Sequence, residues 1–288
     1  APVQVIDVDN ESNILGGAGN VINNLKVFGA QVDVISVIGD CKNAHILNKL
    51  LKEINVDTQY LIIENNRITS KKSRIIASQQ QVIRYDREST DEISLKSQEI
   101  IINTVKSIVQ NYEVILISDY GKGVLTENLT QEIIKIASKF NIKVLIDPKG
   151  LNYSKYSGAY LLTPNIKEAS YATNIEITND KTLKKAITQL KKDCKLKVSL
   201  VTLSEKGIAV YDNAFRVHPT SAKEVYDVTG AGDTVLASLG FSIACKLNID
   251  DAVKFANLAA GVVVGKIGSA TSSLNEIIEY ESSLNKSS

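Results

Sequence analysis

The sequence contains neither methionine nor tryptophan, and its 288 residues include only four prolines and three cysteines. The cysteines, Cys41, Cys194 and Cys245, form no CxxC pair. An odd, scattered set of this kind argues against a disulfide framework and a zinc site, and it suits a reducing cytoplasm. Because the chain starts Ala-Pro-Val without an initiator methionine, we expect a native N-terminal segment to precede it.

Excess charge and long apolar runs are also missing. The formal net charge is +1, so neither nucleic acid nor an acidic membrane is expected as a partner. No apolar run approaches the roughly 18 residues of a membrane-spanning helix, and no signal peptide is visible. With 44% hydrophobic residues, the chain fits a soluble globular protein with a large core, in one large or two smaller domains.

Apolar strands alternate with segments of helical period along most of the chain. Such alternation predicts a mostly parallel sheet with helices on both faces, an α/β fold. We predict strands at 1–8, 32–39, 60–64, 114–120, 144–150, 160–165 and 197–203, and a hairpin at 209–219. We predict helices from about 20 to 28 and at 43–54, 95–110, 126–140, 166–173, 181–193, 234–246 and 250–265.

Residues 67–87 differ in character, because β-branched residues flank a polar Ala-Ser-Gln-Gln turn at 77–80. This pattern predicts a polar β-hairpin that projects from the core as a lid. We therefore expect an α/β core formed by 10–65 and 88–288, and a β lid formed by 1–9 and 66–87.

Polar, mostly glycine-containing segments follow the predicted strands. SDYGKG, DPKG, TPNIKE, TLSEKG and DVTGAGD all fall at strand ends or just beyond. Ligands of such sheets bind at the carboxyl ends of the strands. The sequence therefore predicts one site built from these segments.

The segment DVTGAGD at 227–233 places a glycine-rich turn and a carboxylate before an apolar helix. The amides of Gly230, Ala231 and Gly232 would face an anion at the helix start. A carboxylate beside an anion site is unfavourable without a chemical role, so Asp233 is interpreted as a base next to a phosphoryl group. A plain tight turn is the alternative. The spacing does not match the P-loop pattern.

Other polar residues at these strand ends have two interpretations each. GGAGN at 16–20 is either a ligand contact or a tight turn, and it lacks the GxGxxG spacing. Asn165 and Glu168 either cap a helix or hold hydrated Mg²⁺ and phosphate. Lys122 and Lys149 either bind a phosphate or are solvated. Asp119 and Asp147 are strand-end caps or substrate ligands, and Arg74, Arg84 and Arg87 give the lid a basic character that suits an anion.

GGAGN near the start and DVTGAGD near the end, in this order and spacing, resemble the two signatures of the ribokinase-like (PfkB) carbohydrate kinases. QQQVIRYD, LISDYGKGVLT, VLIDPKG and TPNIKEAS resemble the branch of that family that phosphorylates a heptose 7-phosphate. The resemblance implies a ribokinase-like three-layer sandwich with a small β lid. It also implies ATP-dependent phosphorylation of the anomeric C1 hydroxyl of D-glycero-β-D-manno-heptose 7-phosphate, which serves the synthesis of ADP-heptose for lipopolysaccharide.

The resemblance further implies residue roles. Asp233 would be the base, with Gly230, Ala231 and Gly232 as the anion hole. Asn165 and Glu168 would organise Mg²⁺, through water, and the ATP phosphates. The remaining roles are nucleotide contacts by Thr202, Ser204, Gly207 and Asn257, sugar contacts by Gly17 and Asn20, and a monovalent cation site, K⁺, at Asp227 and Thr229 beside Gly268 and Ser269. For the sugar phosphate our candidates are Arg74, Lys122 and Lys149.

Relatives in this family often pair through the lid, so a homodimer is expected. The family begins with a central strand carrying a Gly-Asp…Asp sugar-binding motif, which we expect to precede residue 1. Some members carry a C-terminal adenylyltransferase domain, whose HxGH motif this chain does not contain. Two alternatives stay open, another sugar, sugar-phosphate or nucleoside kinase of the family and a non-catalytic sugar or nucleotide sensor.

Overall fold

The computed structural model describes residues 6–77, 80–220 and 225–286. Its helices are α1 (Ala18–Val27), α2 (Lys42–Glu53), α3 (Leu95–Ile108), α4 (Glu127–Lys139), α5 (Ile166–Thr173), α6 (Asp180–Asp193), α7 (Ala231–Ala244), α8 (Ile249–Val264) and α9 (Leu274–Asn285). Its strands are β1 (Ser36–Gly39), β2 (Leu61–Glu64), β3 (Lys71–Ala77), β4 (Gln80–Arg87), β5 (Val114–Ser118), β6 (Lys143–Asp147), β7 (Leu161–Leu162), β8 (Ser199–Thr202), β9 (Ile208–Tyr211) and β10 (Phe215–His218).

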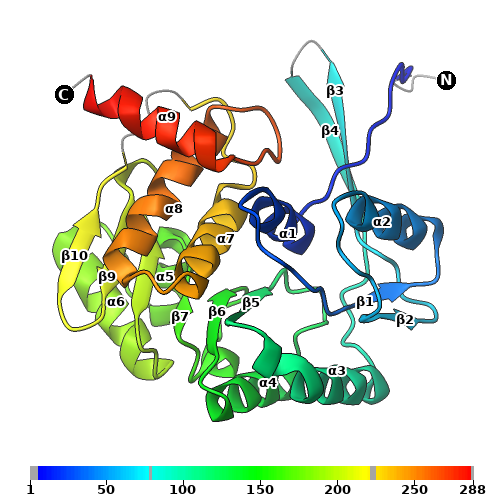
Figure 1. The fold of residues 1–288 in the computed structure, drawn as a ribbon, viewed down its shortest axis with the longest axis horizontal. Helices are drawn as coiled ribbons and strands as arrows, with labels where there is room; N and C mark the ends of the chain where they lie inside the picture. Colours follow the sequence, from blue (N-terminus) through cyan, green and yellow to red (C-terminus); the bar gives the residue numbers. More distant parts are fainter. Residues whose placement is uncertain (1–5, 78–79, 221–224, 287–288) are drawn as a thin grey trace.

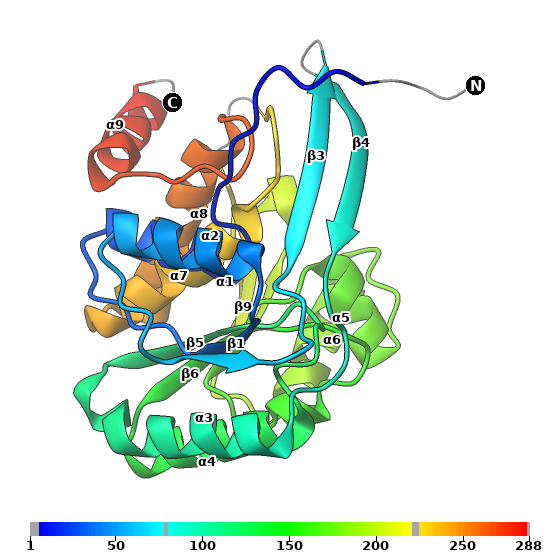
Figure 2. The same ribbon diagram turned by 90° about the vertical axis from the view of Figure 1, so that its right-hand side faces the viewer.

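The strands form a central layer between two layers of helices, and the β3–β4 ribbon projects away from it (Figure 1). In the second view, α3 and α4 lie below the strands, and α1, α2 and α7 lie above them (Figure 2). This is the three-layer α/β sandwich with a small β lid that the sequence predicts. No helix among the described residues has the length and apolar character needed to cross a membrane.

The pairing is parallel at the centre and antiparallel at one edge. β1 pairs with β2, and β5, β6 and β7 pair in that order, all parallel. The Thr202 N–H donates to the Pro164 carbonyl (2.9 Å), which sets β8 beside the end of β7. β8, β9 and β10 then form an antiparallel meander, so the predicted hairpin at 209–219 is confirmed. The carboxyl ends of β5, β6 and β8 consequently point to one edge.

Strand β6 shows why the apolar runs fold as a covered sheet. Val144 and Ile146 pack into an apolar cluster with α3, α4 and α6. Leu145, between them, packs into a second cluster with α1, α7 and α8. Successive side chains of a strand point to opposite faces, so an uninterrupted apolar strand requires helices on both sides.

Some predicted boundaries were wrong. Residues 6–8 of the predicted first strand form no strand, and 1–5 lie outside the described residues. The strand predicted at 32–39 begins only at Ser36. Helix α7 begins at Ala231, three residues early, so Asp233 lies in its first turn. Helix α9 was not predicted, although a reciprocal capping box between Ser273 and Glu276 starts it.

The ribbon is an antiparallel hairpin of β3 and β4, as predicted for the lid. Every residue of β4 is exposed. Lys72 Nζ of β3 contacts Asp86 Oδ2 of β4 (2.9 Å) and Glu88 Oε2 just after β4 (3.1 Å). The predicted turn includes residues 78–79, which lie outside the described residues. Without a buried face, this ribbon adds little to the core.

Candidate active site

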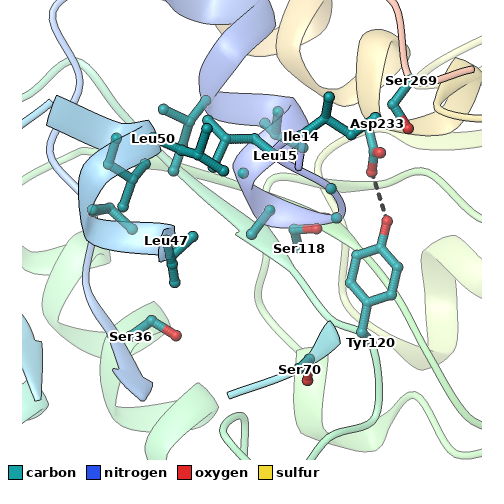
Figure 3. A pocket seen from close by; sticks show the side chains of 18 of the residues that line it. Ile14, Leu15, Ser36, Leu47, Leu50, Ser70, Ser118, Tyr120, Asp233 and Ser269 are labelled. Atoms are coloured by element: carbon teal, nitrogen blue, oxygen red, sulfur yellow. Dashed lines mark hydrogen bonds between the residues drawn. The ribbon is translucent and has the colours of Figure 1, made fainter. Parts of the chain in front are cut away.

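The carboxylate of Asp233 lies at the start of α7, where the sequence predicts a base. Its side chain is held between two distant segments. The Asn20 side-chain amide donates to Oδ2 (3.0 Å), and the Tyr120 hydroxyl donates to Oδ1 (2.8 Å; Figure 3). Asp233 is only 7% exposed. Burial raises the pKa of this carboxyl group, while the two hydrogen bonds lower it and stabilise the charged form.

Both glycine-rich turns allow close approaches around this carboxylate. Gly17, before α1, has φ 56°, and a Cβ there would lie 3.1 Å from the Tyr120 ring. Gly230, before α7, has φ 82°, and a Cβ there would lie 2.7 Å from Asn20 Nδ2. Each turn therefore makes room for one of the two groups that bind Asp233.

The expected anion hole needs one correction. The Ala231 N–H is not free, because it donates to the Val228 carbonyl oxygen (3.2 Å). No side chain caps α7, and within the described part of the chain no acceptor is bonded to the Gly232 N–H. The start of α7 thus offers an anion fewer free amides than the sequence pattern suggested.

Asp233 lines one part of a cavity of about 2460 Å³, which also extends between β1 and β5 to apolar side chains of α2, α3 and α4. The lid and both glycine turns line it. Figure 3 shows Tyr120 beside Asp233 at one side of the cavity and Leu47 and Leu50 of α2 at the other. Of the predicted sugar contacts, Gly17 lies on its wall. Asn20 does not, since it is fully buried behind the carboxylate. Asn20 thus holds the Asp233 side chain in this structure. The family resemblance had implied a contact with the sugar instead.

The three candidate phosphate-binding cations all line this cavity. Lys122 forms an ion pair with Glu88 at the base of the lid. Lys149 forms one with Glu168 (3.0 Å). Both lysines are partly exposed, so an anion in the cavity could compete with these carboxylates. Arg74 lies on β3, and its charge contributes to lowering the pKa of Asp227.

Asn165 and Glu168 form a reciprocal capping box at the start of α5, which the sequence left as one of two interpretations. The Glu168 N–H donates to Asn165 Oδ1 (2.9 Å), and Glu168 Oε2 accepts from the Asn165 N–H (3.1 Å). Asp147, at the end of β6, accepts from the Thr163 hydroxyl (3.0 Å). Burial raises the pKa of Asp147 to about 7, and the charges of Glu168 and Asp233 add to this effect. The acidic side chains of Asp147, Glu168 and Asp233 therefore lie near one another at these strand ends.

The predicted nucleotide contacts lie around the β8–β9–β10 meander. Thr202 ends β8, and Ser204 follows in the connection to β9. Gly207 has φ 93°, and a Cβ there would lie 2.0 Å from the His218 carbonyl oxygen. The Asn257 side-chain amide donates to that same oxygen (2.9 Å). Gly207 and Asn257 are thus brought together across the end of β10.

Three of the residues predicted to bind a monovalent cation, Asp227, Thr229 and Gly268, contact one another. Asp227 accepts from the Thr229 N–H through Oδ1 (2.9 Å) and from the Gly268 N–H through Oδ2 (3.0 Å). Hydrogen bonding by the side chain and the N–H of Thr229, together with the Gly268 N–H, lowers the pKa of Asp227. Among the described residues, no three Asp, Glu, His or Cys side chains are arranged to bind a metal ion directly.

Sequence reasoning missed Tyr120 and the group behind it. Tyr120 belongs to SDYGKG, the segment whose Asp119 and Lys122 were the predicted candidates. Asp119, which the sequence left as a cap or a substrate ligand, is buried and bound by Lys155 Nζ and the Tyr156 hydroxyl, both at 2.6 Å. The available signal for Tyr120 was its position at a strand end of the predicted site.

Comparison with known proteins gives the family. The sequence profile of the pfkB family carbohydrate kinases matches residues 2–276. The chain belongs to this family. Among curated proteins, the "Bifunctional protein HldE" of Aliarcobacter butzleri is 61% identical over 287 residues, and that of Sulfurimonas denitrificans is 56% identical over 287 residues. Each match covers 100% of this chain and 60% of the relative, so the chain spans about 60% of the length of these relatives.

Two solved structures resemble the chain along nearly its whole length. Arabidopsis thaliana ribokinase, complexed with ribose and ATP, has a TM-score of 0.76 at 19% identity and covers 96% of this chain and 90% of its own. Phosphofructokinase-2 from Escherichia coli, in a tetrameric inhibited form, has a TM-score of 0.80 at 18% identity and covers 99% and 92%. At this identity the likeness establishes the fold, which is ribokinase-like.

Proposed function

We propose that this chain transfers the γ-phosphoryl group of ATP to the anomeric C1 hydroxyl of D-glycero-β-D-manno-heptose 7-phosphate. The product would be the 1,7-bisphosphate used for ADP-heptose and lipopolysaccharide. The observation that carries the proposal is the buried Asp233 carboxylate, which faces a large cavity from the first turn of α7. Family membership and the likeness to HldE proteins along the whole chain support the choice of substrate.

The residues support an in-line transfer. Asp233 would accept the proton of the C1 hydroxyl as its oxygen attacks the γ-phosphorus and the bond to the β-phosphate oxygen breaks. The Gly232 amide and the positive end of α7 would stabilise the charge on the transferring group, with Gly230 shaping the turn. Lys122, Lys149 and Arg74 would bind the 7-phosphate, because all three line the same cavity. Thr202, Ser204, Gly207 and Asn257 would lie along the nucleotide.

The acidic group at the strand ends fits a hydrated Mg²⁺ ion. Burial and the charge of Glu168 raise the pKa of Asp147, and a nearby divalent cation would stabilise its charged form. Mg²⁺ retains several waters, which agrees with Asn165 and Glu168 acting through water while they cap α5. When bound, Mg²⁺ neutralises phosphate charge. A monovalent cation such as K⁺ would lie beside Asp227 and Thr229, where two loops meet.

The organisation of the protein is part of the proposal. Residues 10–65 and 88–288 would form the catalytic core, and 1–9 and 66–87 the lid. Apolar side chains exposed on the lid, including Ile76, Val82 and Ile83, suit pairing with the lid of a second copy as a homodimer. We place the reaction in the cytoplasm, where ATP is available.

A substrate panel tests the proposal. The full-length protein is incubated with ATP, Mg²⁺ and one of several sugars, sugar phosphates or nucleosides, and ADP release is measured. We expect the highest kcat/KM with the heptose 7-phosphate. Faster turnover of another acceptor would reassign the substrate, and binding without any turnover would favour a sensor.

A further inference from the structure

A buried polar cluster lies behind the loop that carries Tyr120. Asp119 is 4% exposed and Tyr156 is fully buried. Asp119 Oδ2 accepts from Lys155 Nζ and from the Tyr156 hydroxyl, both at 2.6 Å, and Oδ1 accepts from the Gly121 N–H (2.7 Å). The Tyr156 hydroxyl also accepts from the Lys149 N–H (2.9 Å). One carboxylate therefore fixes the backbone on both sides of Tyr120 and, through Tyr156, the neighbouring loop.

Tyr120 extends from this fixed loop to the base. Its ring packs against Gly17, the residue whose missing side chain leaves room for it. Its hydroxyl donates to Asp233 Oδ1 (2.8 Å). Burial and the charge of Asp233 raise the pKa of the Tyr120 phenol, so it stays protonated and always donates. Asn20 completes the support on the other carboxylate oxygen.

We infer that Tyr120 is the positioning residue of Asp233: its hydroxyl holds the carboxylate in one orientation and in its charged form, and the buried Asp119 cluster holds Tyr120. The role of the carboxylate in turnover rests on the proposed function. The hydrogen bond from Tyr120 and its effect on the titration of Asp233 in the free protein do not rest on it. The positioning role and the proposed function can therefore be tested separately.

The surroundings of Asp233 contain few other groups that could replace this effect. The charged residue of β6 near Asp233 is Asp147. Glu168 and Lys149, which form an ion pair with each other, lie near Asp147. α1 presents the neutral Asn20, and its Lys26 lies in the last turn.

The remaining neighbours are more distant or apolar. α8 carries its charged residues in its first turns, beside the other end of α7, and these are Asp250, Asp251 and Lys254. β5 is apolar up to Ser118. Among the described residues, Tyr120 is the ionisable side chain that donates a hydrogen bond to Asp233, and Asn20, the other donor, is neutral.

The direct test is the titration of Asp233 in the free protein by NMR of ¹³C-labelled aspartate, with Asp233→Asn to assign the signal. Tyr120→Phe keeps the ring on Gly17 and removes only the hydroxyl. We expect the Asp233 midpoint to rise by about one pH unit in Tyr120→Phe, and by less in Tyr156→Phe, because a donor to a carboxylate lowers its pKa. An unchanged midpoint in Tyr120→Phe would overturn the inference.

A matched control exists at the other end of β5. The Tyr112 hydroxyl donates to Asp33 next to the opposite end of β5, so Tyr112→Phe removes the same kind of bond away from the site. It should leave the Asp233 midpoint unchanged, and an equal rise in this variant would contradict a specific role for Tyr120.

Kinetics separates the inference from the proposed function. With heptose 7-phosphate, Tyr120→Phe should lower kcat roughly tenfold, with the KM for ATP unchanged. Wild-type turnover together with equal kcat in the variant would refute the positioning role and leave the proposed function standing. A shifted Asp233 midpoint in a protein that does not phosphorylate the heptose would support the positioning role and refute the substrate.

Discussion

The surroundings of Asp233 and the β3–β4 lid line the same cavity but are built in opposite ways. Asp233 is 7% exposed, and its two hydrogen bonds join residues 213 and 113 positions apart in the chain. The lid is exposed along all of β4, and Lys72 and Arg84 both form ion pairs with Asp86 inside the ribbon. A centre fixed by long-range contacts suits the reacting groups, whereas an exposed ribbon suits a part that closes over a substrate.

This contrast separates two kinds of kinetic effect. Changes around Asp233 should act mainly on kcat, because they alter the reacting group itself. Changes at the candidate phosphate-binding residues Arg74, Lys122 and Lys149 should act mainly on the KM for the sugar phosphate.

The largest effect is expected for Asp233→Asn. An amide cannot accept the hydroxyl proton, so kcat should fall by at least about 1000-fold while ATP still binds. Calorimetric ATP binding and steady-state turnover would measure the two separately. Asp193→Asn, on the exposed end of α6, is the control and should behave as wild type. Substantial residual kcat in Asp233→Asn would refute the assignment of the base.

A smaller loss is expected for Gly230→Ala. The new Cβ would lie 2.7 Å from Asn20 Nδ2 at a residue with φ 82°, so Asn20 and the carboxylate must shift. We expect kcat to fall by roughly 30-fold. Gly29→Ala has a similar φ of 89° with open space around it. It should lower the melting temperature without lowering kcat, and equal kcat losses in the two variants would indicate general strain instead.

The lysines beside the lid should affect binding. Lys122→Ala and Lys149→Ala are each expected to raise the KM for the sugar phosphate about tenfold, and far more than the KM for ATP. Each loses a cation that could bind the 7-phosphate. Lys135→Ala, on the exposed face of α4, serves as the control. If neither substitution at the cavity changes the sugar-phosphate KM, these lysines do not bind the phosphate.

The smallest effect concerns stability. Burial raises the pKa of Asp147 to about 7 from an unfolded value of 3.8. Between these values the folded protein binds the proton more tightly than the unfolded chain, so the free energy of unfolding falls as pH rises from about 4 to 7. Asp147→Asn should therefore melt roughly 4 °C higher than wild type at pH 8 and at a similar temperature at pH 4. Equal differences at both pH values would contradict the raised pKa.

Much of the fold could be predicted from the sequence, because it depends on local signals. The uninterrupted apolar run of β6 indicates a sheet covered on both faces, and the polar pattern of 67–87 indicates an exposed hairpin. Boundaries were less certain. Ala231, Gly232 and Asp233 were assigned to a turn, yet they adopt helical backbone as the first turn of α7.

The site could be predicted only in part. Gly17, Gly230 and Asp233 were selected from motifs, but the contacts between them depend on tertiary structure. Asn20 resembled a sugar contact and is fully buried behind Asp233. Tyr120 carried no distinctive spacing, because its role arises only when β5 and α7 are packed together. Helix capping by Asn165 and Glu168 was one of the two interpretations drawn from the sequence. The structure shows this capping box at the start of α5.

Phosphorus NMR of the reaction of ATP with D-glycero-β-D-manno-heptose 7-phosphate tests the central claim most directly. Wild-type protein should form one new phosphate ester on C1 for each ADP released, and Asp233→Asn should form none. A phosphate on another hydroxyl, or ADP released with free phosphate and no new ester, would contradict the assignment of Asp233 as the base for transfer to C1.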